Sequence, residues 1–304
     1  MDPLDIVFAS PRDYLQHLSV ALASLFAHSP AGRLNVYVIN TDFDRAAWGQ
    51  LLKVNRKFRN NLVDVKTSDA SLDLAASSGE YAKNTYRKIL IPELIPHDKV
   101  LYLDSDLVVT APLDDLYAVN VDDAFLAAVA NPGFSRHRAL GMDGQSNYFN
   151  AGVMVLNLKK WREHSIKDKV IEFARNHPNS VLADQDGINA AINGRWIELP
   201  PRYNLQTYYF ENPGNLQSLP VAVREAMANP AIIHFTGQPK PWNFMSRDRY
   251  KGIYWKYLRK TPFRFYVPAD FTLANIAKRL VPPALKPHLA GWLKRVGIRT
   301  RRLR

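Results

Sequence analysis

Apolar runs of strand length alternate with segments of helical periodicity along the first two thirds of the chain. Strands are expected at residues 5–9, 34–40, 62–66, 100–103, 125–130 and 148–158. Helices are expected after Asp13, which is placed to cap the first of them, and at residues 44–58, 85–95, 159–176 and 184–192. Strands that alternate with helices form βαβ units, so the pattern predicts an α/β fold with a mainly parallel sheet. Such sheets bind ligands beyond the carboxyl ends of their strands.

Two segments depart from this regular pattern. Pro92 is expected to interrupt the helix at residues 85–95, because proline lacks the N–H that a helix interior needs. Residues 68–79 are rich in Ser, Ala and Asp and show little periodicity, which indicates a loop near the ligand site.

The stretch from Lys99 to Val109 joins two apolar runs through a pair of carboxylates. Asp104 and Asp106 stand one residue apart at the end of the first run, so an extended backbone places them on the same side. Two carboxylates at close range repel each other unless a cation lies between them. The arrangement favours a divalent metal that holds a phosphorylated ligand, with a buried structural pair as the alternative.

The pattern Asp-x-Asp is weak evidence by itself, because it occurs three times in this chain. Asp42 and Asp44 follow a strand and precede a helix, where a carboxylate caps free N–H groups and complements the helix dipole. Asp184 and Asp186 also lie at a predicted helix start, so capping has to be weighed there too. Only the pair between the two apolar strands has no capping explanation.

A second candidate segment surrounds His234, which ends an apolar strand. A lone histidine in such a place is more often a core residue than a ligand. Here Gly237 follows, which permits close backbone approach to a ligand, and then Lys240, a point charge suited to phosphate. His234 would complete a site of two carboxylates and one imidazole. Hard oxygen ligands with one imidazole favour Mn²⁺, with Mg²⁺ as the alternative and zinc disfavoured.

The composition narrows the classes of protein that fit. The 304 residues are 47% apolar and include no cysteine, which excludes disulfides, thiolate zinc sites and thiol nucleophiles. Any metal is therefore expected to be held by oxygen and imidazole. No run of eighteen apolar residues is present, so no spanning helix is expected. The first residues lack a basic region, so no signal peptide is expected either.

The net charge of +12 is concentrated at the C-terminal end. No acidic residue follows Phe271, and the nine Lys and Arg residues there leave the rest of the chain near +3, which argues against a nucleic-acid partner. Apolar residues at helical spacing accompany the cations in 289–296, a pattern typical of a helix attracted to anionic lipid. A solvated, partly disordered tail and an RNA-binding tail are the alternatives. We expect a catalytic domain at residues 1–262 and a basic, membrane-associating tail at 263–304.

Five motifs in one order resemble family 8 of the retaining glycosyltransferases. They are Leu-Tyr-Leu-Asp-Ser-Asp at 101–106, Phe-Asn-Ala-Gly-Val at 149–153, Asn-Leu-Lys-Lys-Trp at 157–161, Asp-Gln-Asp at 184–186 and His-Phe-x-Gly-x-x-Lys-Pro-Trp at 234–242. The resemblance extends from Asp5 to about Trp242 and is strongest to bacterial lipopolysaccharide α-galactosyl- and glucosyltransferases. It implies a GT-A nucleotide-binding fold and a UDP-sugar donor whose diphosphate is bridged to Mn²⁺.

The resemblance also implies roles for individual residues. The metal ligands would be Asp104, Asp106 and His234, with Asp104 also near the ribose. The nucleotide and its diphosphate would be bound by Ala9, Asp13, Lys88, Gly237 and Lys240. The donor sugar would be faced by Asn150, Ala151, Gly152, Asp184 and Gln185.

Three positions depart from the family pattern. Pro11 stands where the family has an acidic residue that reads uracil, and Arg12 or Asp13 is the expected substitute. Lys88 replaces an arginine. Asn131 replaces a sugar-binding aspartate of the galactosyltransferases, so the residues leave both galactose and glucose open as the transferred sugar.

The catalytic residues predicted from the resemblance lie at 184–186. Gln185 takes the expected place on the far face of the sugar, but an amide is a poor nucleophile. We therefore favour a front-side mechanism, in which the acceptor attacks from the face that UDP leaves. Asp186 is the remaining candidate for a covalent intermediate, and a structural role that orients Gln185 is the alternative to it.

Together these observations predict a metal-dependent, retaining transferase that moves galactose or glucose from a UDP-sugar to lipopolysaccharide core or a related saccharide. We expect it in the cytoplasm, peripheral on the inner face of a membrane. The metal and Lys240 would neutralise charge on the departing UDP. A non-catalytic nucleotide- or saccharide-binding protein with the same fold is the alternative, and a nucleotidyltransferase is the third interpretation.

Overall fold

A computed structural model describes residues 2–68, 85–131, 134, 137–142, 147–178, 180, 182–207 and 219–280. Nearly all of the loop predicted at 68–79, and the helical pattern at 289–296, lie outside these described residues. None of the helices in the described part of the chain combines the length and apolar character needed to cross a bilayer.

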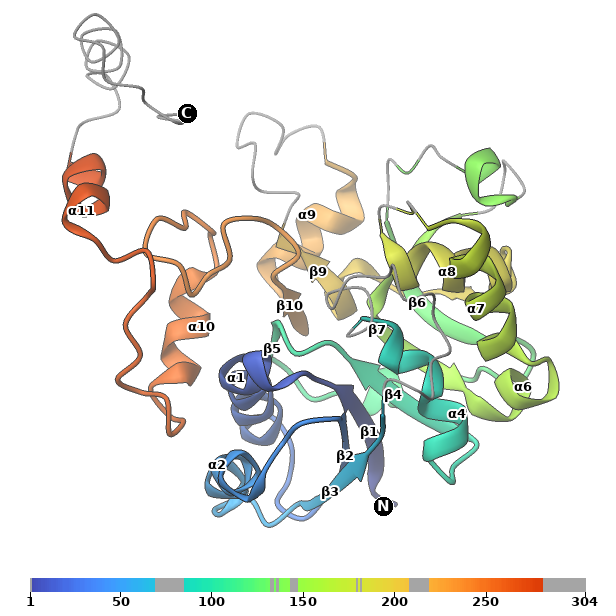
Figure 1. Ribbon diagram of the computed structural model, residues 1–304, viewed down its shortest axis with the longest axis horizontal. Coiled ribbons are helices and arrows are strands. Elements are labelled where there is room, and N and C mark those ends of the chain that lie inside the picture. Colours follow the sequence, from blue (N-terminus) through green and yellow to red (C-terminus); the bar gives the residue numbers. More distant parts are fainter. Residues whose placement is uncertain are drawn as a thin grey trace, which may run out of the picture.

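Seven strands form the central sheet, in the order β3-β2-β1-β4-β7-β6-β8 (Figure 1). Their bounds are Leu4–Ala9 (β1), Leu34–Asn40 (β2), Asn61–Lys66 (β3), Lys99–Leu103 (β4), Leu126–Ala130 (β6), Phe149–Asn157 (β7) and Ile197–Glu198 (β8). The first four are parallel neighbours, β7 runs against both β4 and β6, and β8 is parallel to β6. Six of these seven strands therefore share one direction, which confirms the predicted mainly parallel sheet.

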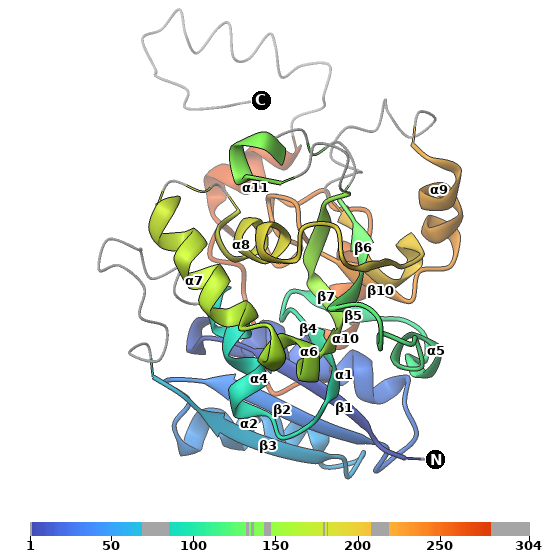
Figure 2. The ribbon, with the colours of Figure 1, turned by 90° about the vertical axis from the view of Figure 1, so that its right-hand side faces the viewer.

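Helices cover both faces of this sheet (Figures 1 and 2). On one face lie α1 (Leu15–Ala27) and α2 (Arg45–Asn55), and α10 (Lys251–Leu258) packs against α1. On the other face lie α4 (Ile91–Leu94), α6 (Leu158–Glu163), α7 (Ile166–Asn176) and α8 (Ala183–Ile192). The side chains of β4 alternate between the two hydrophobic cores, as strand geometry requires: Leu101 and Leu103 face α1, whereas Val100 and Tyr102 face the opposite helices.

A second, three-stranded sheet lies beside the carboxyl end of β4. It consists of β5 (Leu107–Val109), β10 (Ile232–His234) and β9 (Leu205–Gln206), in that order. β10 is antiparallel to β5 and parallel to β9. Because β5 begins only a few residues after β4 ends, this sheet brings the end of β10 next to the turn between β4 and β5.

Shorter elements complete the described chain. The remaining α-helices are α5 (Asp114–Tyr117), α9 (Val221–Ala228) and α11 (Leu273–Leu280), and 3-10 turns occupy Arg12–Tyr14, Arg87–Leu90, His137–Leu140 and Pro201–Asn204. Within the predicted tail, Phe263 and Tyr266 still pack against the core, whereas α11 projects away from it (Figure 1). The division of the chain at residue 262 stays a prediction.

The predicted helix at 159–176 is two helices, α6 and α7. The first begins at Leu158, because the side chain of Asn157 accepts a hydrogen bond from the Lys160 N–H at 2.9 Å and caps it. The break between the helices contains Ser165, whose φ is +50°. Trp161 and Ile166 are five residues apart, a spacing that does not fit one face of a single helix, and the break allows both to be buried.

Two details of helix starts differ from the sequence interpretation. Pro92 lies in the first turn of α4, where its missing N–H costs nothing, so it does not interrupt a helix there. The cap predicted at Asp13 is wrong, because a 3-10 turn places Tyr14 at the N-cap position of α1, which has no side-chain cap. Asp44 does cap α2, by accepting a hydrogen bond from the Ala47 N–H at 2.7 Å.

Candidate active site and metal centre

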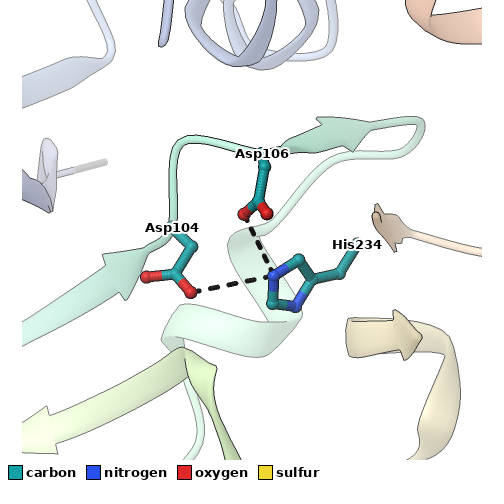
Figure 3. A group of neighbouring side chains, drawn as sticks. All are labelled: Asp104, Asp106 and His234. Atoms are coloured by element: carbon teal, nitrogen blue, oxygen red, sulfur yellow. Dashed lines mark hydrogen bonds and ion pairs between the residues drawn. The ribbon is translucent and has the colours of Figure 1, made fainter. Parts of the chain in front are cut away.

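Three side chains that could hold a metal ion meet at the carboxyl end of β4. Asp104 and Asp106 lie in the turn between β4 and β5, and His234 ends β10 (Figure 3). One ligand atom of each residue lies within 4.8 Å of the other two. The Nε2 atom of His234 is 3.2 Å from Oδ1 of Asp106 and 3.7 Å from Oδ2 of Asp104. The fold thus brings together Asp106 and His234, which are 128 positions apart in the sequence.

Backbone hydrogen bonds fix the turn that carries the carboxylates. The Asp104 N–H donates to the carbonyl of Gly152 in β7 at 2.8 Å, and the Phe235 N–H donates to the carbonyl of Asp106 at 3.0 Å. His234 stands opposite Leu107 in the antiparallel pair of β10 and β5. The imidazole is therefore held beside both carboxylates by the two sheets.

Lys240 brings a cation to the same cluster. Its Nζ atom is 2.8 Å from Oδ2 of Asp106 and also donates to the carbonyl of Phe235. Burial would raise the pKa of the Asp106 carboxyl, but Lys240 and His234 outweigh burial and hold that pKa well below its usual range. Asp106 is therefore ionised at neutral pH, the form that could bind a metal ion.

Lys88 holds two carboxylates of the site together. Its buried Nζ atom is 2.8 Å from Oδ2 of Asp184, 3.2 Å from Oδ1 of Asp104 and 3.2 Å from the carbonyl oxygen of Ala151. Burial would lower the pKa of the Lys88 ammonium, but the neighbouring carboxylates raise it well above its ordinary value. The Tyr102 hydroxyl donates to the same Asp104 oxygen at 2.6 Å. Three acceptors match the three N–H groups of the ammonium, so Lys88 acts on the site by orienting these carboxylates.

Gln185 is oriented by the start of β7. Its Oε1 atom accepts hydrogen bonds from the Ala151 N–H at 3.0 Å and from Nδ2 of Asn150 at 3.1 Å. Its Nε2 atom donates to the Tyr148 hydroxyl at 3.2 Å, which in turn donates to Oδ1 of Asp186 at 2.6 Å. Asp186 is fully buried, and this geometry favours its orienting role over a role as nucleophile.

A cavity of about 560 Å³ contains most of the predicted site. The predicted residues that line it are Ala9, Lys88, Asp104, Asp106, Asn150, Ala151, Gly152, Asp184, Gln185, His234 and Lys240. Asn131 lines it as well, whereas Asp186, Asp13 and Gly237 are not among the lining residues. The fold therefore gathers eleven of the fourteen predicted residues around one space.

The part of the cavity near Pro11 lacks the residues that were expected to recognise uracil. Pro11 and Tyr14 line it, but Asp13 is exposed and Arg12 forms an ion pair with Asp44 at 2.7 Å. The Arg12 side chain is thus held by the start of α2, and neither expected substitute for a uracil-reading carboxylate lines the cavity.

The residues present fit a divalent cation and a polar ligand. Two carboxylates and one imidazole are the oxygen and nitrogen donors that Mn²⁺ or Mg²⁺ accepts. Gly152 leaves the space that the ligands need, since a Cβ atom there would lie 2.1 Å from Cε1 of His234 and 2.7 Å from Oδ2 of Asp104. In the described part of the chain, the buried Ser105 Oγ and Gln206 Oε1 atoms have no hydrogen-bond partner, and both residues line the cavity.

Sequence reasoning missed three residues that hold side chains of the candidate site in place. Tyr102 and Tyr148 read as apolar strand residues, yet their hydroxyls hold Asp104 and Gln185. Asn204 lies in a 3-10 turn with no motif around it, and its side chain is 3.0 Å from Nδ1 of His234. The available signal for the two tyrosines was a hydroxyl on an otherwise apolar strand, which needs a partner when buried.

The fold and this site define a GT-A glycosyltransferase. The structure of the galactosyltransferase LgtC in complex with donor and acceptor sugar analogues superposes with a TM-score of 0.72 at 24% identity, and covers 88% of this chain and 99% of that one. The structure of the glycosyltransferase GlyE of Streptococcus pneumoniae serotype 4 (strain TIGR4) gives a TM-score of 0.66 at 28% identity, and covers 85% of this chain and 60% of that one.

The chain belongs to glycosyl transferase family 8, whose sequence profile matches residues 5–246. General stress protein A of Bacillus subtilis (strain 168) is 30% identical over 269 residues, which are 85% of this chain and 94% of that protein. The chain matches only 60% of the length of GlyE and 30% of GlyD, another glycosyltransferase of the same pneumococcal strain. The expected family and GT-A fold are thereby confirmed.

Proposed function

We propose that this glycosyltransferase transfers a hexose, galactose or glucose, from a UDP-sugar to a saccharide acceptor with retention of configuration. The observation that carries the proposal is the cluster of Asp104, Asp106 and His234 with Lys240 beside it, all of which line one cavity. The three ligands would hold Mn²⁺, with Mg²⁺ as the alternative. The metal would supply positive charge to the diphosphate that departs.

Lys240 would supply the second cation of the phosphate site. Its ammonium is paired with Asp106 and donates to the Phe235 carbonyl, and its long aliphatic chain would let it turn toward a diphosphate held at the metal. Charge that develops on the leaving oxygen would then be stabilised by a cation already in place, which is the large electrostatic contribution in such a transfer. Gly237, three residues earlier, would let the backbone approach the same phosphates.

The sugar would lie against the start of β7 and α8. Asn150, Ala151 and Gly152 line the cavity next to Gln185, which accepts hydrogen bonds from the first two, and Asp184 lines it as well. The bond between the anomeric carbon and the diphosphate oxygen breaks, and the acceptor oxygen bonds to that carbon from the same face. The acceptor proton passes to the departing diphosphate oxygen, so no protein carboxylate has to act as base or nucleophile.

The test is hydrolysis of UDP-galactose and of UDP-glucose without acceptor, measured as UDP release with and without Mn²⁺. We expect Asp106→Asn to lower Mn²⁺-dependent release at least about 100-fold, because a catalytic metal supplies several kcal/mol. Asp168→Asn, on the exposed surface of α7, is the matched control and should release UDP like the wild type. Turnover that is unchanged by Asp106→Asn would remove the metal centre from the proposal. No turnover with any sugar nucleotide would favour a non-catalytic binding protein.

We also propose a cytoplasmic location on the inner face of a membrane, reached through residues 263–304, with a lipid-linked saccharide such as lipopolysaccharide core as the acceptor. Support comes from the apolar side chains of this segment. Phe265 is 82% exposed, and Leu273 and Leu280 at the two ends of α11 are 86% and 77% exposed. Lys278 and Arg279 lie in the same helix, which suits an anionic lipid surface.

Co-sedimentation with vesicles tests this attachment. Truncation after Val267 should release the protein from phosphatidylglycerol vesicles but leave transfer to soluble acceptors intact. It also removes Asp270, whose carboxylate accepts the N–H groups of Phe244 and Met245, so a second variant is needed. Replacing both Leu273 and Leu280 by serine keeps that contact and should weaken binding to the vesicles. Undiminished vesicle binding by both variants would overturn the proposed attachment.

A further inference from the structure

The imidazole of His234 has a second partner besides the carboxylates. Its Nε2 atom faces Asp104 and Asp106, and its Nδ1 atom lies 3.0 Å from Oδ1 of Asn204. Asn204 is 1% exposed and is the last residue of the 3-10 turn before β9, which pairs with the strand that His234 ends. A neutral imidazole carries its proton on one nitrogen only, so the partner of Nδ1 decides which nitrogen has a free lone pair.

The oxygen and nitrogen of the Asn204 amide can be assigned from a backbone N–H group nearby. The Gly152 N–H is 3.0 Å from Oδ1 of Asn150, and an N–H can only donate, so this atom of Asn150 is the oxygen. Nδ2 of Asn204 lies 2.9 Å from that same oxygen and therefore has to be the amino group. The other end of the Asn204 amide, which faces His234, is then an oxygen.

An oxygen facing Nδ1 requires a proton on Nδ1. We infer that Asn204 is a positioning residue, which holds His234 with its Nδ1–H donated to the amide and its Nε2 lone pair directed at the metal site between Asp104 and Asp106. The opposite tautomer would place two acceptors against each other at Asn204 and a proton where the metal binds. Such outer partners of a metal-bound histidine typically change metal affinity 10- to 100-fold.

The same chain of donors continues beyond Asn204. Asn150 donates from Nδ2 to Oε1 of Gln185, whose orientation is fixed independently by the Ala151 N–H. Gln185 donates to the Tyr148 hydroxyl, and the chain ends on the buried carboxylate of Asp186. Every link donates in one direction, from the imidazole to that carboxylate. The metal ligand and the amide that faces the sugar are therefore oriented by one continuous network.

The inference rests on the proposed metal centre, so metal binding is measured first and without any sugar nucleotide. Titration of the full chain with Mn²⁺, followed by the EPR signal of free Mn²⁺, gives the dissociation constant. Asn204→Leu keeps the volume but removes both hydrogen bonds, and should weaken Mn²⁺ binding 10- to 100-fold. Asn204→Asp keeps an acceptor for Nδ1–H and should bind Mn²⁺ within about threefold of the wild type, because carboxylates serve this role in many metal sites.

Asn55→Leu is the matched control. Asn55 is buried at the end of α2, makes two hydrogen bonds, with the N–H and the carbonyl of Asn60, and does not line the cavity. It should leave Mn²⁺ affinity unchanged. Excess Mn²⁺ should restore UDP release by Asn204→Leu, which it would not do for a variant whose fold is damaged.

The outcomes separate the two proposals. A wild-type chain that binds no Mn²⁺ overturns the metal centre and this inference with it. A wild type that binds Mn²⁺, with a folded Asn204→Leu variant that binds equally well, overturns the inference alone. Loss of affinity in Asn204→Asp as large as in Asn204→Leu also overturns it, because the acceptor at Nδ1 would then not be what matters.

Discussion

Replacing Gly152 by alanine should disrupt the candidate metal centre while leaving the fold in place. The added Cβ atom would lie 2.1 Å from Cε1 of His234, and an ordinary contact needs at least 3.4 Å. The imidazole therefore has to retreat by about 1.3 Å, or β7 has to move by a similar amount. Metal sites tolerate ligand displacements of about 0.2 Å, so the substitution should reduce metal affinity more than it reduces the stability of the fold.

The magnitudes differ for metal affinity and for stability. Because the required displacement is several times the tolerance of a metal site, we expect Gly152→Ala to weaken Mn²⁺ binding by more than about 100-fold and to abolish Mn²⁺-dependent UDP release. Overpacking of a buried position costs about 1–3 kcal/mol of unfolding free energy. The variant should therefore remain folded, with a lower urea midpoint.

Gly252 in α10 supplies the control. Apart from its own helix backbone, no atom of the described residues lies within 4 Å of where its Cβ would be, so Gly252→Ala should leave Mn²⁺ affinity unchanged. It should also raise the unfolding free energy slightly, by about 0.4–1 kcal/mol. Both variants are compared by Mn²⁺ EPR titration and by urea unfolding. Wild-type Mn²⁺ affinity in a folded Gly152→Ala protein would refute the packing argument and the placement of His234 with it.

Three further measurements test the electrostatics of the molecule. Lys88→Met should lower the unfolding free energy by about 3–5 kcal/mol, because it leaves Asp104 and Asp184 without their shared cation; a loss below about 1 kcal/mol would contradict this. Burial lowers the pKa of His17 to about 4, so the unfolded chain takes up a proton first as pH falls from about 6.5 to 4. Over that range the unfolding free energy of the wild type, measured by urea unfolding, should fall with decreasing pH by up to about 1.4 kcal/mol per pH unit more than that of His17→Gln. Equal pH dependence of the two unfolding free energies would contradict this. Mn²⁺ at 100 times its dissociation constant should stabilise the wild type by about 2.7 kcal/mol, and EDTA or Asp106→Asn should remove the gain.

The centre of the sheet could be predicted because β1, β4, β6 and β7 are buried on both faces. Runs such as Ile6 to Ala9 and Val100 to Leu103 are apolar throughout, and each precedes a turn or a helix signal. Helix boundaries were harder, because they depend on contacts outside the segment. The break at Ser165 allows both Trp161 and Ile166 to be buried. Asp13 does not cap α1 because a 3-10 turn precedes the helix, and no local sequence pattern predicted that turn.

The candidate site could be predicted where its residues form an unusual combination in the sequence, and not where a common residue acts through its position in the fold. Two carboxylates between apolar strands indicate a site, and so does a histidine followed by Gly237 and Lys240. Asn204 is an ordinary asparagine, and its importance depends on β9 lying beside β10, a pairing with no sequence signature. Gly152 was expected to face the sugar, whereas the structure shows that its missing side chain also makes room for His234.

The positions of the carboxylates around the cavity indicate how the anomeric configuration of the sugar would be retained. The carboxylates among the described lining residues of the cavity are Asp104, Asp106 and Asp184. The first two belong to the candidate metal centre, and Asp184 is paired with Lys88 at 2.8 Å. Asp186 is buried behind Gln185 and accepts the Tyr148 hydroxyl, so it would have to break that network to reach a sugar. Since a covalent intermediate needs a carboxylate free to approach the anomeric carbon, this arrangement supports same-face attack by the acceptor over double displacement.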